Sequence, residues 1–500
     1  MRLEEVLSFE QSIIPFPDMA TVPNEILAKI FSSGTRAWQE EYPDHLPFPL
    51  LICGVCRHWR MLAQSTPELW SFIIPPLHLF GRDEDGKRWT SEWLSRSGTL
   101  PISAVIDDRL RESKGYSTKN SQSVILGVLR AFHSLAHRLR RLDIWSHHIF
   151  PHDLNILFQN AKEPIQLRQL SICSARITQT QILPHTSPQS SLMFSWFAQL
   201  PRMHKLRLAG AIFPLVSTLT TLCVHELCAR YSEIQTIFST CPNIKTLILP
   251  QLLPIAFADA STTPRVLATA LKSLAVSFKR SLHLNGTSDY LVSVLLMPNL
   301  EYLEIHGDIE ISWAFDASLS SSKVQTLRLS KRTKGLNKAD QLFLRTLQNL
   351  HHLELLDASI DGILTEGSGS MGRKRSTSSL FSFTSGPSSL ATSTHSASWS
   401  GLTNITLNTL SAEDVMHLCR FVNRHRGIRS VWLSKGAKRH LTKSLVRNGD
   451  IVYMKDPRRK VKSTETNDVE HWLCKQVDVK IFKFCFGLLD CEGFPLQKLH

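Results

Sequence analysis

The sequence predicts an α/β protein in which a small helical module near the N-terminus is followed by an irregular solenoid of strand–helix units. Two observations support this prediction. Apolar residues at helical spacing lie within residues 21–75, and one apolar phrase recurs ten times within residues 120–436. The chain has 500 residues, of which 42% are hydrophobic, so it can bury the cores of roughly two to four domains or of one extended array.

The helical module consists of two apolar stretches, VPNEILAKIF and LLICGVCRHWRMLA, and a short third piece, PELWSF. The first stretch begins with Pro23, which a first helical turn tolerates because its missing N–H would have no partner there. The second stretch, residues 50–63, predicts one longer helix, because its apolar stripe is formed by Leu51, Val55, Trp59 and Leu62. Pro67 cannot continue that helix, so the apolar residues after it are expected to fold back on the pair: Leu69, Trp70 and Phe72.

Helices this short have too little core to be stable alone, and they carry more large apolar groups than their mutual contact would bury. A partner is therefore implied. The module resembles an F-box of the fungal F-box-like type through three ordered groups of residues: Pro23, Glu25, Ile26, Leu27, Ile30 and Phe31; Val55, Cys56, Arg57 and Trp59; Pro67, Leu69 and Trp70. This resemblance implies docking on the Skp-type adaptor of a cullin-RING ubiquitin ligase.

On this resemblance, we expect ten residues to form the adaptor face or its immediate support: Pro23, Ile26, Leu27, Ile30, Phe31, Leu51, Val55, Trp59, Leu62 and Trp70. The module departs from the family in its insert at residues 32–49, which is longer than the usual link between the helices. The insert carries one glycine and three prolines, which predict a loop.

Residues 76–119 are expected to connect the module to the array. They contain a polar hinge at residues 81–87, a helix around residues 89–94 and a strand at residues 101–106.

The phrase apolar-x-x-apolar-x-apolar then starts at ten positions: Leu139, Leu167, Met203, Ile244, Leu271, Leu300, Val324, Leu350, Leu402 and Ile428. The starts are 28, 36, 41, 27, 29, 24, 26, 52 and 26 residues apart, and most of these gaps lie near the period of leucine-rich repeats. Helix-like stretches such as residues 123–136 and 231–241 lie between the strands. The pattern resembles an irregular leucine-rich-repeat array, and an ordinary α/β domain is the alternative.

The 52-residue gap contains a Ser/Thr/Gly-rich tract, residues 367–400, which has too few large apolar groups to order itself. It predicts a flexible insertion. Its RKRSTSS segment places basic residues ahead of serines, a pattern typical of basophilic kinase sites, so Ser376 and Ser378 are candidate phosphosites. Residues 437–500 are expected to be a cap, with a final helix–strand unit at residues 469–486, and a tail; residues 1–20 are an N-terminal tail.

We expect no enzymatic activity, cofactor or metal. Cys53 and Cys56 form a CxxC, but no second ligand pair lies at zinc spacing, and their place within an amphipathic stretch favours core packing. The densest set of possible ligands also matches no metal motif and is expected to be a wet rim: His147, His148, His152, Asp143 and Asp153. Phosphate-binding loops, nucleophile elbows and zinc-protease or kinase signatures are absent from the sequence.

Binding is the remaining function. In each repeated strand the residue between the last two apolar positions should face a partner: Asp143, Ser171, Arg207, Ile248, Ala275, Glu304, Arg328, Glu354, Thr406 and Trp432. Basic residues gather in the first repeats, which predicts an acidic or phosphorylated target segment there. The expected partner-binding residues are Arg140, Arg141, Arg168, Lys205, Arg207, Glu304, Arg328 and Trp432.

The formal charge of +14 also suits a nucleic-acid partner, but the charge is scattered and no stacking-aromatic motif accompanies it, so nucleic acid is not expected. The N-terminus lacks a signal-peptide pattern, and the apolar runs are too short to span a bilayer. Together with ten scattered cysteines, these features predict an intracellular protein, cytoplasmic or nuclear, with no membrane partner and no small-molecule substrate.

The sequence therefore predicts the substrate-recognition subunit of a Skp–cullin–F-box ubiquitin ligase, which would hold a target protein for modification by another enzyme. Two alternatives remain. One is a repeat-protein scaffold that does not direct ubiquitination, and the other is a basic protein associated with nucleic acid.

Overall fold

The computed structural model of the protein describes residues 22–41, 47–77, 80, 82–108, 121–146, 151–158, 165–173, 180–183, 200–210, 212–227, 231–252, 264–278, 294–307, 323–332, 340, 344, 347–358, 399, 401–442, 444–447, 450–453, 467–468, 473–474 and 476–482. The protein is mixed α/β, and its main strands run parallel. It divides into two compact units: unit 1 (Met1–Ile177 and Thr186–Ala211) and unit 2 (Thr178–His185 and Ile212–His500).

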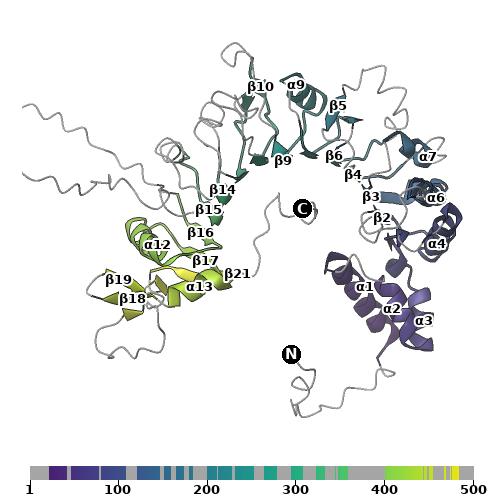
Figure 1. The fold of residues 1–500 in the computed structure, drawn as a ribbon, viewed down its shortest axis with the longest axis horizontal. Helices are drawn as coiled ribbons and strands as arrows, with labels where there is room; N and C mark the ends of the chain where they lie inside the picture. The colour runs from purple at the N-terminus through teal and green to yellow at the C-terminus, as the bar shows by residue number, and fades with distance from the viewer. Residues whose placement is uncertain are drawn as a thin grey trace, which may run out of the picture. The chain divides into compact units, whose positions relative to one another are not determined.

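Unit 1 begins with the helical module. Its elements are α1 (Asn24–Glu41), α2 (Phe48–Val55), α3 (Arg57–Gln64) and the 3-10 helix η3 (Pro67–Trp70), and they pack against one another (Figure 1). The interior of the module is formed by Leu27, Phe31, Ile52, Ala63, Leu69 and Trp70. The expected fold-back of Leu69 and Trp70 is confirmed, because the Trp70 indole Nε1 donates a hydrogen bond to the Ala63 carbonyl at 2.7 Å.

Two predictions about the module are wrong. Where the structure describes the insert 32–49 it is mainly helical and not a loop, since α1 continues to Glu41 and α2 already starts at Phe48. Gly34 permits this arrangement, because a Cβ there would lie 2.6 Å from the Phe48 ring. The expected long helix is broken at Cys56, whose backbone is extended and whose Sγ accepts a hydrogen bond from the Trp59 N–H at the start of α3.

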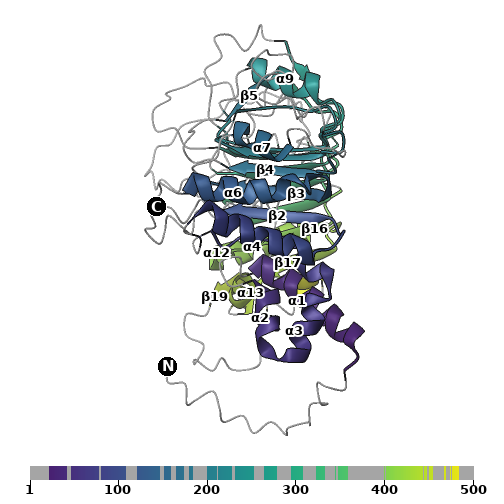
Figure 2. The same ribbon diagram turned by 90° about the vertical axis from the view of Figure 1, so that its right-hand side faces the viewer.

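A parallel sheet follows the module in unit 1. Its strands are β1 (Phe72–Ile73), β2 (Ile102–Asp107), β3 (Leu139–Trp145), β4 (Gln169–Cys173) and β6 (Lys205–Ala209), and each pairs with the next. The helices α4 (Asp83–Arg96), α6 (Ser121–His133) and α7 (Asn155–Phe158) lie side by side along β2, β3 and β4 (Figure 2). Short 3-10 turns, η6 (Ala136–Arg138) and η7 (Pro151–Leu154), precede β3 and α7.

The expected polar hinge at residues 81–87 is also wrong, because α4 starts at Asp83. Three acidic residues in its first turn stabilise the helix dipole, and the Asp85 carboxylate accepts the Arg82 N–H. The segment 76–119 thus contributes a helix and a sheet strand to unit 1. Trp93 of α4 contacts the Trp70 ring edge-on at 4.8 Å between centroids, which joins the module to the sheet layer.

The contact between α4 and α6 depends on glycine. A Cβ on Gly127 of α6 would overlap the backbone of Asp83, whereas a Cβ on Gly54 of α2 would meet no atom. We expect Gly127→Ala to destabilise unit 1 by about 1–3 kcal/mol, because overpacking outweighs the better helix propensity of alanine. Gly54→Ala is the matched control and should stabilise by about 0.5–1 kcal/mol. Urea denaturation measures both; equal effects of the two alanines would contradict this packing.

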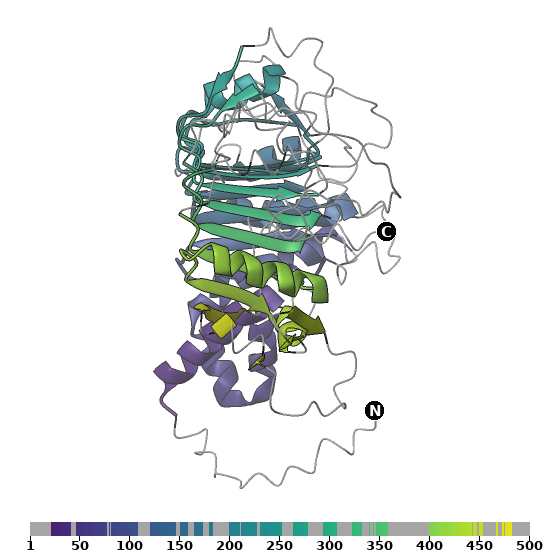
Figure 3. The same cartoon turned by 90° about the vertical axis from the view of Figure 1, so that its left-hand side faces the viewer.

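Unit 2 contains a longer parallel series. Its strands pair in the order β8 (Thr221–His225), β9 (Thr246–Leu252), β11 (Ser273–Phe278), β13 (Tyr302–His306), β14 (Thr326–Arg332), β15 (His352–Ala358), β16 (Asn404–Leu407), β17 (Ser430–Ser434) and β21 (Asp478–Phe482). The helices are α9 (Tyr231–Thr240), α12 (Ala412–Arg424) and α13 (Lys435–Thr442), and α12 lies against the last strands of the series (Figure 3).

Smaller pairs accompany this series. They are β5 (Gln181–Leu183) with β7 (Ile212–Pro214), β10 (Val266–Leu267) with β12 (Leu295–Leu296), and the antiparallel set β18 (Ser444–Arg447), β19 (Asp450–Tyr453) and β20 (Asn467–Asp468). Every helix in the described part of the chain is too short or too polar to cross a bilayer.

All ten strands expected from the repeated phrase are present, and their three apolar positions are never more than 4% exposed. Consecutive strands within each unit pair in register, so equivalent positions of the phrase lie side by side. Strand β8 was not predicted, although Leu219, Leu222 and Val224 fit the same phrase and lie 25 residues before the next start, Ile244. It accounts for the irregular 41-residue gap.

Candidate functional site

The first candidate site is the outer surface of the helical module. Seven large apolar side chains are exposed among the described residues, and five of them belong to this module: Ile26, Ile30, Leu51, Val55 and Met61. Ile26 and Ile30 lie one turn apart on α1, and Leu51 and Val55 lie one turn apart on α2, so each pair shares a helix face. We call these five residues the apolar surface. The other two exposed residues, Leu267 and Ile481, lie in unit 2.

The structure separates the ten residues expected at the adaptor face into three groups. Pro23, Ile26, Ile30, Leu51 and Val55 are exposed, whereas Leu27, Phe31 and Trp70 are buried inside the module and can only support its shape. Trp59 and Leu62 are half-buried, and the Trp59 ring lies 4.8 Å from the Phe31 ring between centroids. Met61 was not predicted, because a single helix over residues 50–63 would place it on the same side as the arginines. The break at Cys56 rotates α3 relative to α2 and so changes the direction in which Met61 points.

Cys53 and Cys56 do not form the expected core pair. Cys56 is exposed at the start of α3, and Cys53 is half-buried. Burial raises the pKa of the Cys53 thiol, and the positive charges of Arg96 and Arg60 partly oppose this. Groups of three or more possible metal ligands do not occur within the described residues. His147 and His148 lie outside those residues, as do Ser376 and Ser378.

The second candidate site is the sheet face that carries the residues expected to meet a partner. Here the prediction needs correction, because nine of those ten side chains are buried and only Trp432 is half-exposed. Strands of a parallel sheet are commonly covered on both faces, and the alternating sequence did not reveal this. Of the proposed contact residues, Arg207, Glu304 and Arg328 are buried, Lys205 is half-buried, and Arg140, Arg141 and Arg168 are exposed.

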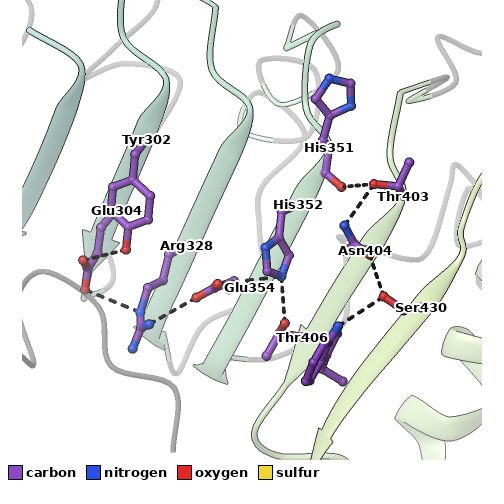
Figure 4. A network of polar contacts seen from close by, with 11 residues as sticks. Tyr302, Glu304, Arg328, His351, His352, Glu354, Thr403, Asn404, Thr406 and Ser430 are labelled. Carbon is purple, nitrogen blue, oxygen red and sulfur yellow. Dashed lines mark hydrogen bonds and ion pairs between the residues drawn. The ribbon is translucent and has the colours of Figure 1, made fainter. Parts of the chain in front are cut away.

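In unit 2 this face contains a row of alternating charges that pair with one another. Glu304, Arg328 and Glu354 are register partners on β13, β14 and β15. The Arg328 Nε atom lies 3.5 Å from Glu304 Oε1, and its Nη1 atom lies 3.1 Å from Glu354 Oε2 (Figure 4). Both carboxylates and the guanidinium are buried. The row therefore acts as a polar interior and presents no free charge to a partner.

Neighbouring residues complete this network. The Tyr302 hydroxyl donates to Glu304 at 2.9 Å, and His306 Nε2 lies 2.8 Å from the same carboxylate. Burial alone would raise the pKa of Glu304. That pKa is nevertheless below its usual value, because of the hydrogen bond and charge of His306, the charge of Arg328 and the hydrogen bond from the Tyr302 hydroxyl. Burial and the Glu304 charge raise the pKa of Tyr302, which keeps it a donor.

The network continues toward β17. His352 Nε2 lies 2.8 Å from the Thr406 hydroxyl and 3.7 Å from Glu354. Burial lowers the pKa of His352, and the Glu354 charge only partly opposes this. Beyond it, the Ser430 hydroxyl donates to Asn404 and accepts from the Trp432 indole (Figure 4). Lys480 of β21 lies 5.0 Å from the centre of the Trp432 ring, a cation–π contact that the sequence did not reveal.

These pKa shifts predict that unit 2 loses stability in acid. A lowered pKa means that the unfolded state binds protons more readily than the folded state as the pH falls. His352 should contribute a loss as the pH falls below about 7, and Glu304 a further loss below about pH 4.5. The check is the urea midpoint as a function of pH. His352→Gln should flatten the upper part of the curve, and an unchanged slope would contradict this assignment.

In unit 1 the same face and its edge are basic. Arg141 forms an ion pair with Asp143 at 2.5 Å, and Gln169 donates to the same carboxylate. Arg140 and Arg168 lie just outside this pair and are exposed. No protein-family model matches the chain, and no curated protein matches it in sequence. The two candidate docking surfaces, the apolar surface of the helical module and the basic edge of unit 1, are therefore identified from the structure alone.

Proposed function

We propose that the chain is the substrate-recognition subunit of a Skp–cullin–F-box ubiquitin ligase. The helical module docks the Skp-type adaptor through the apolar surface, and the strand–helix units form a leucine-rich-repeat-like solenoid that binds the target protein. The observation that carries the proposal is the concentration of exposed apolar side chains on α1, α2 and α3, where five of the seven found in the described chain lie. Exposed apolar groups gathered on one small module are typical of a protein-binding site.

Two further features support this function. The module resembles an F-box in its three ordered residue groups, and the interior it needs is formed by the resemblance residues Leu27, Phe31 and Trp70. The apolar positions of the ten repeated strands are all buried and aligned in register within each unit, as stacked repeats require.

The mechanism is proximity. A receptor that holds a target beside a charged carrier enzyme converts a bimolecular encounter into an effectively intramolecular one, with effective concentrations of about 1 mM or more for short links. The carrier enzyme performs the covalent step, and the receptor contributes orientation and residence time.

The test is co-purification of the full chain with a recombinant Skp-type adaptor and cullin. Recovery of a stoichiometric complex, with a shorter lifetime of the bound target in cells, supports the proposal. Adaptor binding without any effect on target lifetime would favour the scaffold alternative, and absence of adaptor binding would reject the proposal.

A further inference from the structure

The basic edge of unit 1 consists of one row of residues at the start of three neighbouring strands. Arg140 of β3, Arg168 just before β4 and His204 just before β6 lie at equivalent positions, because the Arg168 N–H donates to the Arg140 carbonyl at 2.8 Å and the His204 N–H donates to the Arg168 carbonyl at 3.0 Å. All three are exposed. We call them the basic row. Adjacent members are one strand spacing, about 4.8 Å, apart.

Other arginines at this end of the sheet are engaged within the protein. Arg138 donates to the Leu100 carbonyl and to the Ser97 hydroxyl, Arg141 pairs with Asp143, and Arg202 donates to Gln166. Arg140 and Arg168 have no ion pair or side-chain hydrogen bond within the described part of the chain. Two like charges on adjacent strands destabilise the sheet, so their side-by-side placement has no structural benefit.

The equivalent row in unit 2 is mixed. It contains Lys245, Lys272, Glu301, Gln325, His351, Thr403 and Arg429. Lys272 is paired with Glu301 at 2.9 Å, and Arg429 lies between Thr403 and Val477. Adjacent arginines in such a row therefore occur, among the described residues, only in unit 1.

We propose that the basic row binds an extended acidic segment of the target protein, with successive Asp or Glu carboxylates on successive members of the row. This deepens the proposed function and rests on it. Arginine is suited to this partner because its planar guanidinium pairs with a carboxylate through two parallel hydrogen bonds. Neighbouring residues of an extended peptide advance by about 3.3 Å and same-side residues by about 6.6 Å, and these distances bracket the strand spacing of about 4.8 Å, so the long side chains of the row can reach carboxylates of one linear run.

The test is direct binding of a fluorescein-labelled octaglutamate peptide to the full chain, followed by anisotropy at about 0.05 and 0.3 M salt, with octaglutamine as the neutral control. The octaglutamate peptide should bind in a salt-sensitive manner. Arg140→Ala/Arg168→Ala should weaken it about tenfold, while Arg429→Ala, the matched control in unit 2, should leave it unchanged. Because both side chains are exposed, the double variant should melt no lower than wild type.

Three results would overturn the proposal. The first is that the double variant binds octaglutamate as tightly as wild type, and the second is that octaglutamine binds as tightly as octaglutamate. The third is that a peptide with one phosphoserine, or an oligothymidylate, binds more tightly than octaglutamate through these arginines. The first two reject an acidic partner, and the third replaces a run of carboxylates with a phosphate ligand. Adaptor capture is measured on the same proteins and should not change in the double variant. A chain that binds octaglutamate but captures no adaptor would refute the proposed function and leave the basic row intact.

Discussion

Replacing Ile30 and Val55 together by aspartate should abolish capture of the Skp-type adaptor while the fold persists. Ile30 is 53% exposed and Val55 is 61% exposed, so neither carboxylate enters the module interior. A fully buried apolar side chain contributes roughly 1.5–3 kcal/mol, so losing two at an interface should weaken binding at least about a hundredfold. Pull-down and calorimetry with purified adaptor measure the loss, and circular dichroism checks the fold.

The matched control is Leu267→Asp, which changes an equally exposed apolar residue (59%) in unit 2. It should leave adaptor capture at the wild-type level. Undiminished capture by the Ile30/Val55 variant would place the docking site elsewhere, and a loss caused by Leu267→Asp would show that general surface hydrophobicity, and not the apolar surface of the module, determines binding.

Arg328→Ala should destabilise unit 2 by about 3–5 kcal/mol. The substitution leaves the buried carboxylates of Glu304 and Glu354, which lie two strands apart, without the guanidinium that pairs with both. Urea denaturation of the full chain, monitored by the tryptophans of unit 2, measures the effect.

Two companion variants make this prediction specific. Lys272→Ala removes an exposed ion pair on neighbouring strands and should cost no more than about 1 kcal/mol. The triple variant Glu304→Gln/Arg328→Met/Glu354→Gln removes the three charges together and should recover most of the lost stability. A small effect of Arg328→Ala, comparable to that of Lys272→Ala, would mean that the buried row is not held by charge.

The sequence predicted the strands of this protein well, because its strongest signal is the spacing of apolar residues. Each of the ten repeated phrases became a strand with its apolar positions buried. The one missed strand, β8, carries the same phrase. It lies in the 41-residue gap between Met203 and Ile244, which was taken as an irregularity of the repeat. Helix ends were harder: α1 runs through Gly34, where the glycine serves close packing against Phe48 and does not break the helix.

The candidate sites were less predictable, because exposure is a property of the assembled fold. The stripe expected on residues 50–63 is only partly exposed: Leu51 and Val55 face outward, whereas Trp59 and Leu62 are half-buried. Similarly, Glu304 and Arg328 resembled binding residues until their register partners showed that they neutralise each other. Periodicity identifies a stripe, but only tertiary contacts decide which stripe is covered.

The junction at Trp70 has a geometric consequence for the proposed receptor. The indole bonds to Ala63 of the module and contacts Trp93 of α4, and the next residues enter the sheet through β1. The module and the strands that carry the basic row thus belong to one compact body. The strands from β1 to β6 then set the distance between the helical module and the members of the basic row. In the proposed receptor each strand adds about 4.8 Å between the docked adaptor and the target, and we expect this distance to decide which target lysines the carrier enzyme can reach.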